Sequence, residues 1–191
     1  METRNFEEDL QNSNNPILKQ IWEKIIKKKF GNDCIISWKD DLNIQKGLGT
    51  DIIIKTKKGR RYSIELKTRN HRTYKNPEYI MEIVHHIYDK ETEPRLHIGT
   101  KDGWVYMTTA EFIFHATLNE EGTDIIECLF YSLHPFKNPE FKSFFNKFPV
   151  MWLTTNFSNG TFQLTLNKLI PIKEIRENAL SFWYWSKENE L

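Results

Sequence analysis

The segment from Asp51 to Thr68 constrains the fold of this chain more than any other segment. Two strand-like runs, the apolar Asp51-Ile-Ile-Ile-Lys-Thr and the alternating Arg61-Tyr-Ser-Ile-Glu-Leu-Lys-Thr, flank the sequence Lys57-Lys-Gly-Arg. Runs of this kind around a glycine predict a β-hairpin that turns at Gly59. Because the apolar residues Tyr62, Ile64 and Leu66 share one face of the second strand, they fix its register, and Ser63, Glu65 and Lys67 fall on the other face.

Acidic and basic side chains cluster at the open end of this hairpin. Asp51 begins the first strand, and a hairpin of this length can bring its carboxylate beside that of Glu65. Two neighbouring carboxylates repel each other unless a cation lies between them, and such hard oxygen ligands suit Mg²⁺ or Mn²⁺. Lys67 could then stabilise a phosphoryl transition state or orient a water molecule, a combination that suits phosphodiester hydrolysis. The alternative is a solvated strand face on which Glu65 and Lys67 form an ordinary ion pair.

An amphipathic helix is predicted before the hairpin. Asn15 and Pro16 precede apolar residues at spacings of three and four from Ile17 to Ile26, and Gly31 ends the pattern. Glu23 lies on the polar face of this helix, between Lys19 and Lys27. It could be a third acid of the hairpin site, or it could simply belong to a surface ladder of i,i+4 ion pairs.

The rest of the chain reads as a series of short elements. We expect a strand at 34–38, a strand rather than a helix at 78–88, a strand at 103–107, a buried element at 109–118, a short helix within 133–150, a hairpin of 151–157 with 161–166 that turns at 158–160, and a helix at 172–179. Residues 1–15 are acidic and rich in Asn, and we expect a flexible arm there.

Composition bounds the class of protein. A chain of 191 residues with 39% apolar and 14% aromatic residues predicts one globular domain. No apolar run is long enough for a membrane helix, and the start Met-Glu-Thr-Arg does not resemble a signal peptide, so we expect a cytoplasmic protein without a membrane partner. Cys34 and Cys128 each lie in an apolar segment and are expected to be free core thiols.

The net charge of +1 conceals a segregation of charge along the chain. Residues 17–75 hold 16 Lys and Arg against 6 Asp and Glu, whereas the rest of the chain is acidic. A basic segment around the hairpin predicts contact with a phosphate backbone, although most charge runs are only solvated surfaces. The expected phosphate contacts are Lys58, Arg60, Arg61, Arg69 and Arg72.

Asp51 and the motif Glu65-x-Lys67, flanked by Ile64 and Leu66 and preceded by a helix with Glu23, resemble the PD-(D/E)XK nuclease superfamily. The similarity covers Ile17 to about Arg72 and is closest in layout to small phage-type or Holliday-junction-resolvase-like members. Thr50 stands where the family motif has Pro, and Thr68-Arg69 after Lys67 carries no diagnostic signature. A second, fainter similarity downstream raises Glu82 as an auxiliary acid, although an ordinary surface glutamate explains it as well.

The resemblance implies an α/β fold of restriction-endonuclease-like type, with an α-β-β-β-α-β core and a mixed central sheet flanked by helices. Residues 16–118 would form this core, and 119–191 an aromatic-rich C-terminal extension packed on it. Asp51, Glu65 and Glu23 would hold Mg²⁺ or Mn²⁺, and Lys67 would lie beside the phosphate of double-stranded or branched DNA. The resemblance also allows a homodimer.

The expected activity is that of a divalent-metal-dependent endonuclease that hydrolyses phosphodiester bonds in DNA. Two other readings stay open. The fold could serve as a catalytically inactive nucleic-acid-binding or protein-interaction module, or the enzyme could act on RNA instead of DNA.

Overall fold

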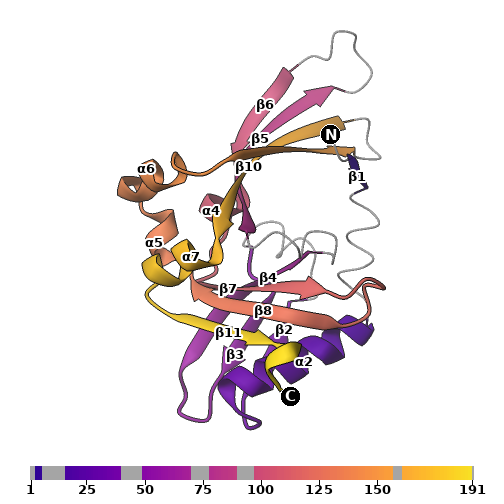
Figure 1. The fold of residues 1–191 in the computed structure, drawn as a ribbon, viewed down its shortest axis with the longest axis vertical. Coiled ribbons are helices and arrows are strands. Elements are labelled where there is room, and N and C mark those ends of the chain that lie inside the picture. Colours follow the sequence, from indigo (N-terminus) through magenta and orange to yellow (C-terminus); the bar gives the residue numbers. More distant parts are fainter. Residues whose placement is uncertain are drawn as a thin grey trace.

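The computed structural model describes residues 3–5, 16–39, 49–69, 78–89, 97–156 and 161–190, which form two β-sheets and several short helices. The lower sheet of Figure 1 has six strands in the order β11-β8-β7-β4-β3-β2. The upper sheet has five strands in the order β1-β9-β10-β5-β6. The chain is therefore a mixed α/β protein with few helices.

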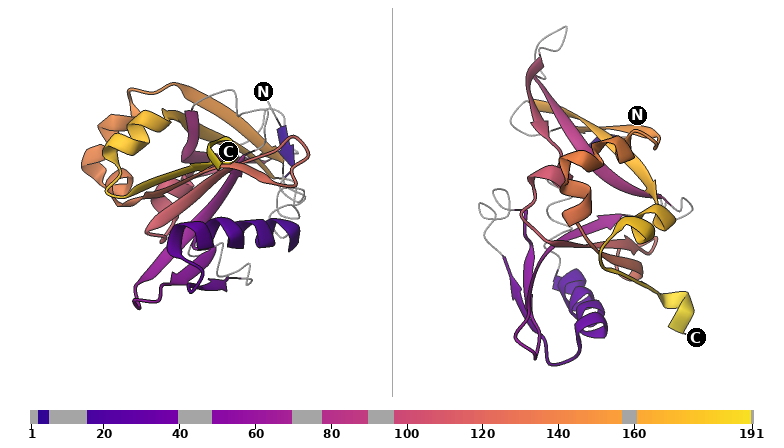
Figure 2. Two further views of the ribbon diagram at one scale, coloured as in Figure 1. Left: turned by 60° about the horizontal axis from the view of Figure 1, so that its bottom comes forward. Right: turned by 90° about the vertical axis from the view of Figure 1, so that its left-hand side faces the viewer.

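The longest helix, α2 (Pro16–Phe30), covers one face of the six-stranded sheet (Figure 2). It buries Leu18, Trp22, Ile25 and Ile26, as the apolar spacing in the sequence predicted. Gly31 ends the helix with a φ of +92°, and its N–H donates to the carbonyl of Lys27 at 2.8 Å. A glycine suits this position because left-handed backbone is costly for other residues.

The predicted hairpin is confirmed. β2 (Ile35–Trp38), β3 (Ile52–Lys55) and β4 (Arg61–Arg69) form an antiparallel meander. Ile52 pairs with Ile64 and Lys55 pairs with Arg61, so the chain turns around Gly59, whose φ is +79°. Next to β4 lies β7 (Phe112–Leu118), which runs parallel to it, followed by the antiparallel strands β8 (Ile125–Ser132) and β11 (Phe182–Ser186).

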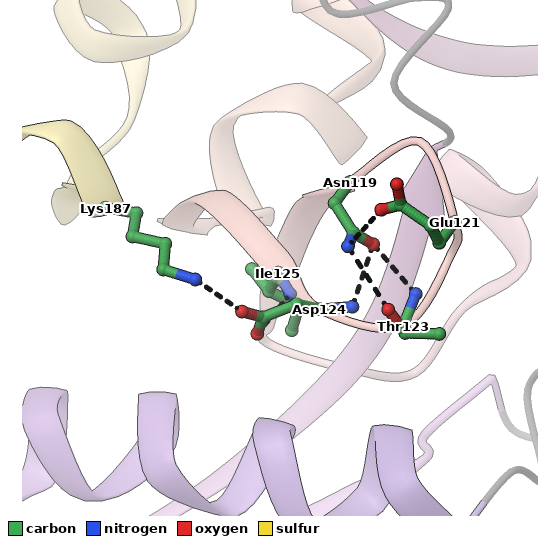
Figure 3. A network of polar contacts seen from close by, with 6 residues as sticks. All are labelled: Asn119, Glu121, Thr123, Asp124, Ile125 and Lys187. Carbon is green, nitrogen blue, oxygen red and sulfur yellow. Dashed lines mark hydrogen bonds and ion pairs between the residues drawn. The ribbon is translucent and has the colours of Figure 1, made fainter.

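A short loop between β7 and β8 is held together by one asparagine (Figure 3). Asn119 Oδ1 accepts hydrogen bonds from the N–H groups of Thr123 and Asp124 at 2.8 and 2.9 Å, and its Nδ2 donates to Glu121 at 2.7 Å. Lys187 in η3 (Lys187–Glu190) pairs with Asp124 at 2.7 Å. The C-terminal 3-10 turn is thereby tied to the end of the six-stranded sheet.

The upper sheet consists of β5 (Glu78–Asp89), β6 (His97–Asp102), β9 (Val150–Asn156), β10 (Thr161–Pro171) and β1 (Thr3–Asn5). The strand at 78–88 and the antiparallel pairing of the 151–157 and 161–166 segments are confirmed, although β10 continues to Pro171. The predicted turn at 158–160 lies outside the described residues. Within the segment expected to be a flexible arm, Thr3–Asn5 instead pairs in parallel with β9.

One predicted strand, at 103–107, is wrong. These residues form the one-turn helix α4 (Trp104–Met107), in which the N–H groups of Tyr106 and Met107 donate to the carbonyl of Gly103. Val105 is fully buried by this turn. The segment is too short for its apolar periodicity to distinguish a strand from one turn of helix.

The remaining helices lie beside the two sheets. They are α5 (His134–Lys137), η2 (Pro139–Phe141), α6 (Lys142–Phe145) and α7 (Ile172–Asn178). The short helix expected within 133–150 and the helix expected from 172 are both found. None of the described helices is long and apolar enough to cross a membrane.

Two hydrophobic cores hold the molecule together. The helix-side core lies between α2 and the six-stranded sheet and includes Trp22, Ile26, Ile52, Ile64, Phe114 and Phe130. The inter-sheet core joins residues of both sheets to the short helices and includes Met81, Ile113, Tyr131, Phe136, Ile170 and Ile175. Cys34 and Cys128 are buried and free, as expected.

The connection from β4 to β7 differs from the expected core. Parallel neighbours require a crossover, for which the resemblance predicted a helix. In the described residues, β5, β6 and the single turn of α4 occupy this connection. The crossover therefore contributes two strands to the upper sheet.

Candidate active site

Asp51 is locked against β4 by two hydrogen bonds. Its backbone N–H donates to the carbonyl of Ile64 at 3.0 Å, and its Oδ2 accepts from the N–H of Leu66 at 2.7 Å. The side chains of Ile64 and Leu66 pack in the helix-side core, so the strand that holds Asp51 is itself fixed. The carboxylate therefore has a defined place beside Glu65 and Lys67.

Glu65 and Lys67 lie on the face of β4 opposite to Ile64 and Leu66, toward the inter-sheet core. Glu65 is only 4% exposed, and its Oε1 lies 2.6 Å from Lys67 Nζ. Lys67 Nζ also lies 5.1 Å from the ring centroid of Trp104, within the range of a cation–π interaction. The predicted trio of Asp51, Glu65 and Lys67 is thus brought together.

Glu65 Oε2 is buried and has no hydrogen-bond partner among the described residues. The Tyr131 hydroxyl, on the strand two places from β4 in the sheet, is in the same situation. Burial together with the charge of Glu65 raises the pKa of this hydroxyl well above its usual range. An unsatisfied buried carboxylate oxygen is costly, and a cation or an ordered water would relieve that cost.

The electrostatics of Asp51 also favour a cation near these two carboxylates. Burial raises the pKa of its carboxyl, and the charge of Glu65 adds to this rise, whereas Lys67 and the Leu66 N–H oppose it. Two carboxylates in a partly desolvated place favour a hard divalent cation such as Mg²⁺ or Mn²⁺. Asp51 and Glu65 are therefore the two described carboxylates that could hold such an ion.

The loop before β7 supports the approach to Asp51. Thr108 Oγ1 donates to the carbonyl of Gly49 at 2.6 Å, and the hydroxyls of Thr50 and Thr109 share a hydrogen bond of 3.3 Å. Gly49 has a φ of +58°, and a Cβ atom there would lie 2.7–2.8 Å from atoms of Thr108. Only glycine fits this contact without a shift of the backbone.

Lys137 is a second cation of the region, and the sequence analysis missed it. Its Nζ donates to the carbonyls of Thr108 and Ala110 at 2.6 and 2.7 Å. Burial lowers the pKa of Lys137, whereas Glu65 and Glu111 oppose that shift. Its place within the aromatic segment His134-Pro-Phe-Lys was the available signal, because a lysine among apolar residues has to find polar partners.

His115 lies beside Lys67 in the register of β4 with β7. Burial, assisted by the charges of Arg69 and Lys67, lowers its pKa well below the usual range. The imidazole is therefore neutral at neutral pH.

Glu23 does not join the other acids. It lies on α2, and its Oε1 accepts a hydrogen bond of 3.4 Å from Trp38 Nε1. In the part of the chain that the structure describes, no three His, Cys, Asp or Glu side chains come together as a metal-binding group. Glu82 lies in β5, but its side chain is outside the described residues.

Arg69 was expected to contact phosphate, and the structure gives it a different place. It is 5% exposed, its Nε donates to Thr117 Oγ1 at 2.7 Å, and its guanidinium pairs with Glu127 at 3.1 Å. Tyr184 completes this buried network by donating to Glu127 Oε2 at 3.2 Å. Arg69 thus ties β4 to β7 and β8, and we do not retain it as a phosphate contact.

The other expected phosphate contacts that the structure describes lie away from the carboxylates. Lys58, Arg60 and Arg61 are exposed around the turn of the hairpin, and Arg72 lies outside the described residues. Asp51 precedes Lys55 by four residues, which corresponds to about 13 Å of strand. The basic segment around the hairpin was expected to contact phosphate, and the cations at its turn lie one strand length away from the acids.

Comparison of the chain with protein-family models, with curated proteins and with solved structures finds no match in any of the three. The chemistry of the site is accordingly inferred from its own residues.

Proposed function

We propose that the protein is a Mg²⁺- or Mn²⁺-dependent endonuclease that hydrolyses phosphodiester bonds in double-stranded or branched DNA. The observation that carries this proposal is Glu65 Oε2, a buried carboxylate oxygen without a described hydrogen-bond partner, beside Asp51 and the Lys67 ammonium. Two acids and a lysine in this arrangement suit metal-assisted attack on a phosphodiester.

The order of elements supports membership of the PD-(D/E)XK superfamily. Helix α2 precedes the antiparallel meander β2-β3-β4, and β7 lies parallel beside β4, as in a restriction-endonuclease-like core. The crossover through β5, β6 and α4 departs from the single helix of that core. We propose that the six-stranded sheet is the nuclease core and that the upper sheet is an elaboration of its crossover.

Asp51 and Glu65 would hold the ion, which when bound supplies positive charge at the phosphate and lowers the pKa of a water molecule. Lys67 Nζ, which contacts Glu65 Oε1 and the Trp104 ring, would donate to a phosphate oxygen and offset the charge that develops there. The Leu66 N–H holds Asp51 Oδ2 and so orients the carboxylate. Because Asp51 must be deprotonated to bind a cation, metal affinity falls as the pH drops through its raised pKa.

A binding module without catalysis is the second candidate, and one observation favours it. Lys67 already satisfies Glu65 Oε1, and Glu23 does not complete a three-ligand group among the described residues. A lysine can replace a metal as the counter-ion of a buried acid. Such a protein would bind nucleic acid without taking up Mn²⁺.

Cleavage assays test the proposal. The full chain is incubated with supercoiled plasmid, a four-way DNA junction and single-stranded RNA, each with Mg²⁺, Mn²⁺ or EDTA. We expect metal-dependent cleavage of DNA that Asp51→Ala and Lys67→Ala abolish. Lys173→Ala is the matched control, because Lys173 is an exposed lysine of α7.

Cleavage that survives Asp51→Ala and Lys67→Ala would refute the proposed site. No cleavage of any substrate, together with DNA binding, would favour the binding module. Cleavage of RNA alone would redirect the activity to RNA.

A further inference from the structure

A second group of cations gathers at the end of the six-stranded sheet that is remote from Asp51. We call this surface the basic end. It comprises Lys27 of α2, Lys55 of β3, Lys57, Lys58 and Arg60 of the turn, and Arg61 of β4. Figure 1 shows the turn of the β3–β4 hairpin and the chain that leaves α2 together at the bottom of the molecule.

The basic end is built on a rigid frame. The rings of Phe30, the last residue of α2, and Tyr62 in β4 lie 4.9 Å apart. Arg60 stacks over the same Tyr62 ring at 5.3 Å, and Lys57 pairs with Asp33 at 3.1 Å. The contact between Phe30 and Tyr62 therefore holds the end of the helix beside the hairpin turn.

We infer that the basic end is a binding surface for the phosphate backbone of duplex DNA, separate from the residues proposed to act on the scissile bond. Most of its cations are exposed, and Arg60 and Arg61 offer the planar donor geometry that suits phosphate. Ile35, beside Lys55, is the large exposed apolar side chain at this end, which is too little for insertion into a lipid bilayer. A cluster of exposed positive charges is complementary to a polyanion such as a phosphate backbone.

One face of β4 links the basic end to the proposed active site. Arg61, Ser63, Glu65 and Lys67 alternate with the residues of the helix-side core and so share a face of the strand. Glu65 and Arg61 are four residues, or about 13 Å, apart along β4, and the turn extends the reach to about 20 Å. Since a base pair rises about 3.4 Å, this span corresponds to about four to six base pairs of duplex.

The geometry thus gives the substrate a minimum length on one side of the cleaved bond. This length requirement rests on the proposed nuclease function, whereas the binding of DNA by the basic end does not. The two parts can be tested separately.

The binding part is measured by fluorescence anisotropy of labelled duplex DNA in EDTA, between about 50 and 200 mM salt. The test variant is Lys58→Gln/Arg60→Gln/Arg61→Gln. The matched control, Lys101→Gln/Lys147→Gln/Arg176→Gln, removes the same charge from exposed residues elsewhere. We expect the test variant to lower the slope of log affinity against log salt by about 3, one for each lost phosphate contact, and the control to leave it unchanged.

Equal salt slopes for the two triple variants would overturn the inference while leaving the active site untouched. Tighter binding of the wild type to phosphatidylserine vesicles or to duplex RNA than to duplex DNA would also overturn it. Urea unfolding of both triple variants checks that each is folded, so that a change in DNA binding reflects lost contacts and not unfolding.

The length part uses duplexes in which one flank of a fixed cleavage site is shortened from about 12 to about 2 base pairs. We expect wild-type cleavage to fall once this flank is shorter than about four to six base pairs, and the test variant to be insensitive to it. Equal sensitivity in both proteins would overturn the length requirement. Absence of cleavage with every substrate would refute the nuclease function but not the DNA binding of the basic end.

Discussion

Gly49→Ala probes the contact that positions Asp51. Gly49 has a φ of +58°, and an added Cβ would lie 2.7 Å from Thr108 Oγ1 and 2.8 Å from Thr108 Cα. The backbone atom cannot rotate away, so the Gly49–Asp51 segment has to move from the loop before β7. The substitution should therefore disturb both stability and the placement of the Asp51 carboxylate.

The expected cost has three parts. Left-handed backbone costs a non-glycine residue about 1–2 kcal/mol. The overlap with Thr108 adds about 1–3 kcal/mol, by analogy with overpacked cores. Loss of the 2.6 Å hydrogen bond from Thr108 Oγ1 to Gly49 adds about 0.5–1.5 kcal/mol. These parts overlap, and we expect a loss of about 3–5 kcal/mol in the free energy of unfolding.

Gly59→Ala is the matched control. Gly59 also has a positive φ, of +79°, but an added Cβ would have no atom within 4 Å. Only the backbone cost of about 1–2 kcal/mol should appear. Urea unfolding followed by circular dichroism gives both values, and equal losses in the two variants would refute the proposed role of the Gly49–Thr108 contact.

Three further predictions concern the polar groups around the site. Because burial raises the Asp51 pKa, the charged carboxylate destabilises the metal-free protein at neutral pH. Asp51→Asn should therefore raise the unfolding midpoint at pH 7, and this gain should disappear toward about pH 4, as the carboxyl becomes protonated in both the folded and the unfolded protein. A gain that persists at about pH 4 would contradict this prediction. Lys137→Met removes two hydrogen bonds to backbone carbonyls and should cost about 2–4 kcal/mol in urea unfolding, whereas an unchanged midpoint would deny Lys137 its structural role. Arg69→Met removes the cationic partner of the buried Glu127 carboxylate and should cost about 3–5 kcal/mol, most of which Arg69→Met/Glu127→Leu should restore. Additive losses in this double-mutant cycle would argue against coupling of the pair.

Local sequence patterns predicted the elements that carry the proposed site. The spacing of Ile17 to Ile26 and the alternation from Arg61 to Thr68 are strong because each repeats over several periods. The face of β4 that bears Glu65 and Lys67 followed directly from the apolar face occupied by Ile64 and Leu66. The proximity of Asp51 to Glu65 followed from the length of the hairpin.

Contacts between residues far apart in the chain could not be predicted from the sequence. Arg69 looks like its basic neighbours along the chain, and its burial depends on Glu127, 58 residues away. Lys137 reaches Thr108 from 29 residues away, and its apolar neighbours indicate only that it needs polar partners, not which ones. The second sheet, which β5, β6, β9, β10 and β1 form, depends on strand pairings between distant segments, so single strands were predictable but their assembly was not.

The most direct test of the central claim is the binding of Mn²⁺ by the full chain, measured by isothermal titration calorimetry at pH 7. If Glu65 Oε2 and Asp51 are metal ligands, the wild type should bind Mn²⁺, and Glu65→Gln should weaken binding at least about tenfold. Lys173→Gln should bind as the wild type does. Absence of Mn²⁺ binding by the wild type, or equal affinity in Glu65→Gln, would contradict a metal site at these two carboxylates.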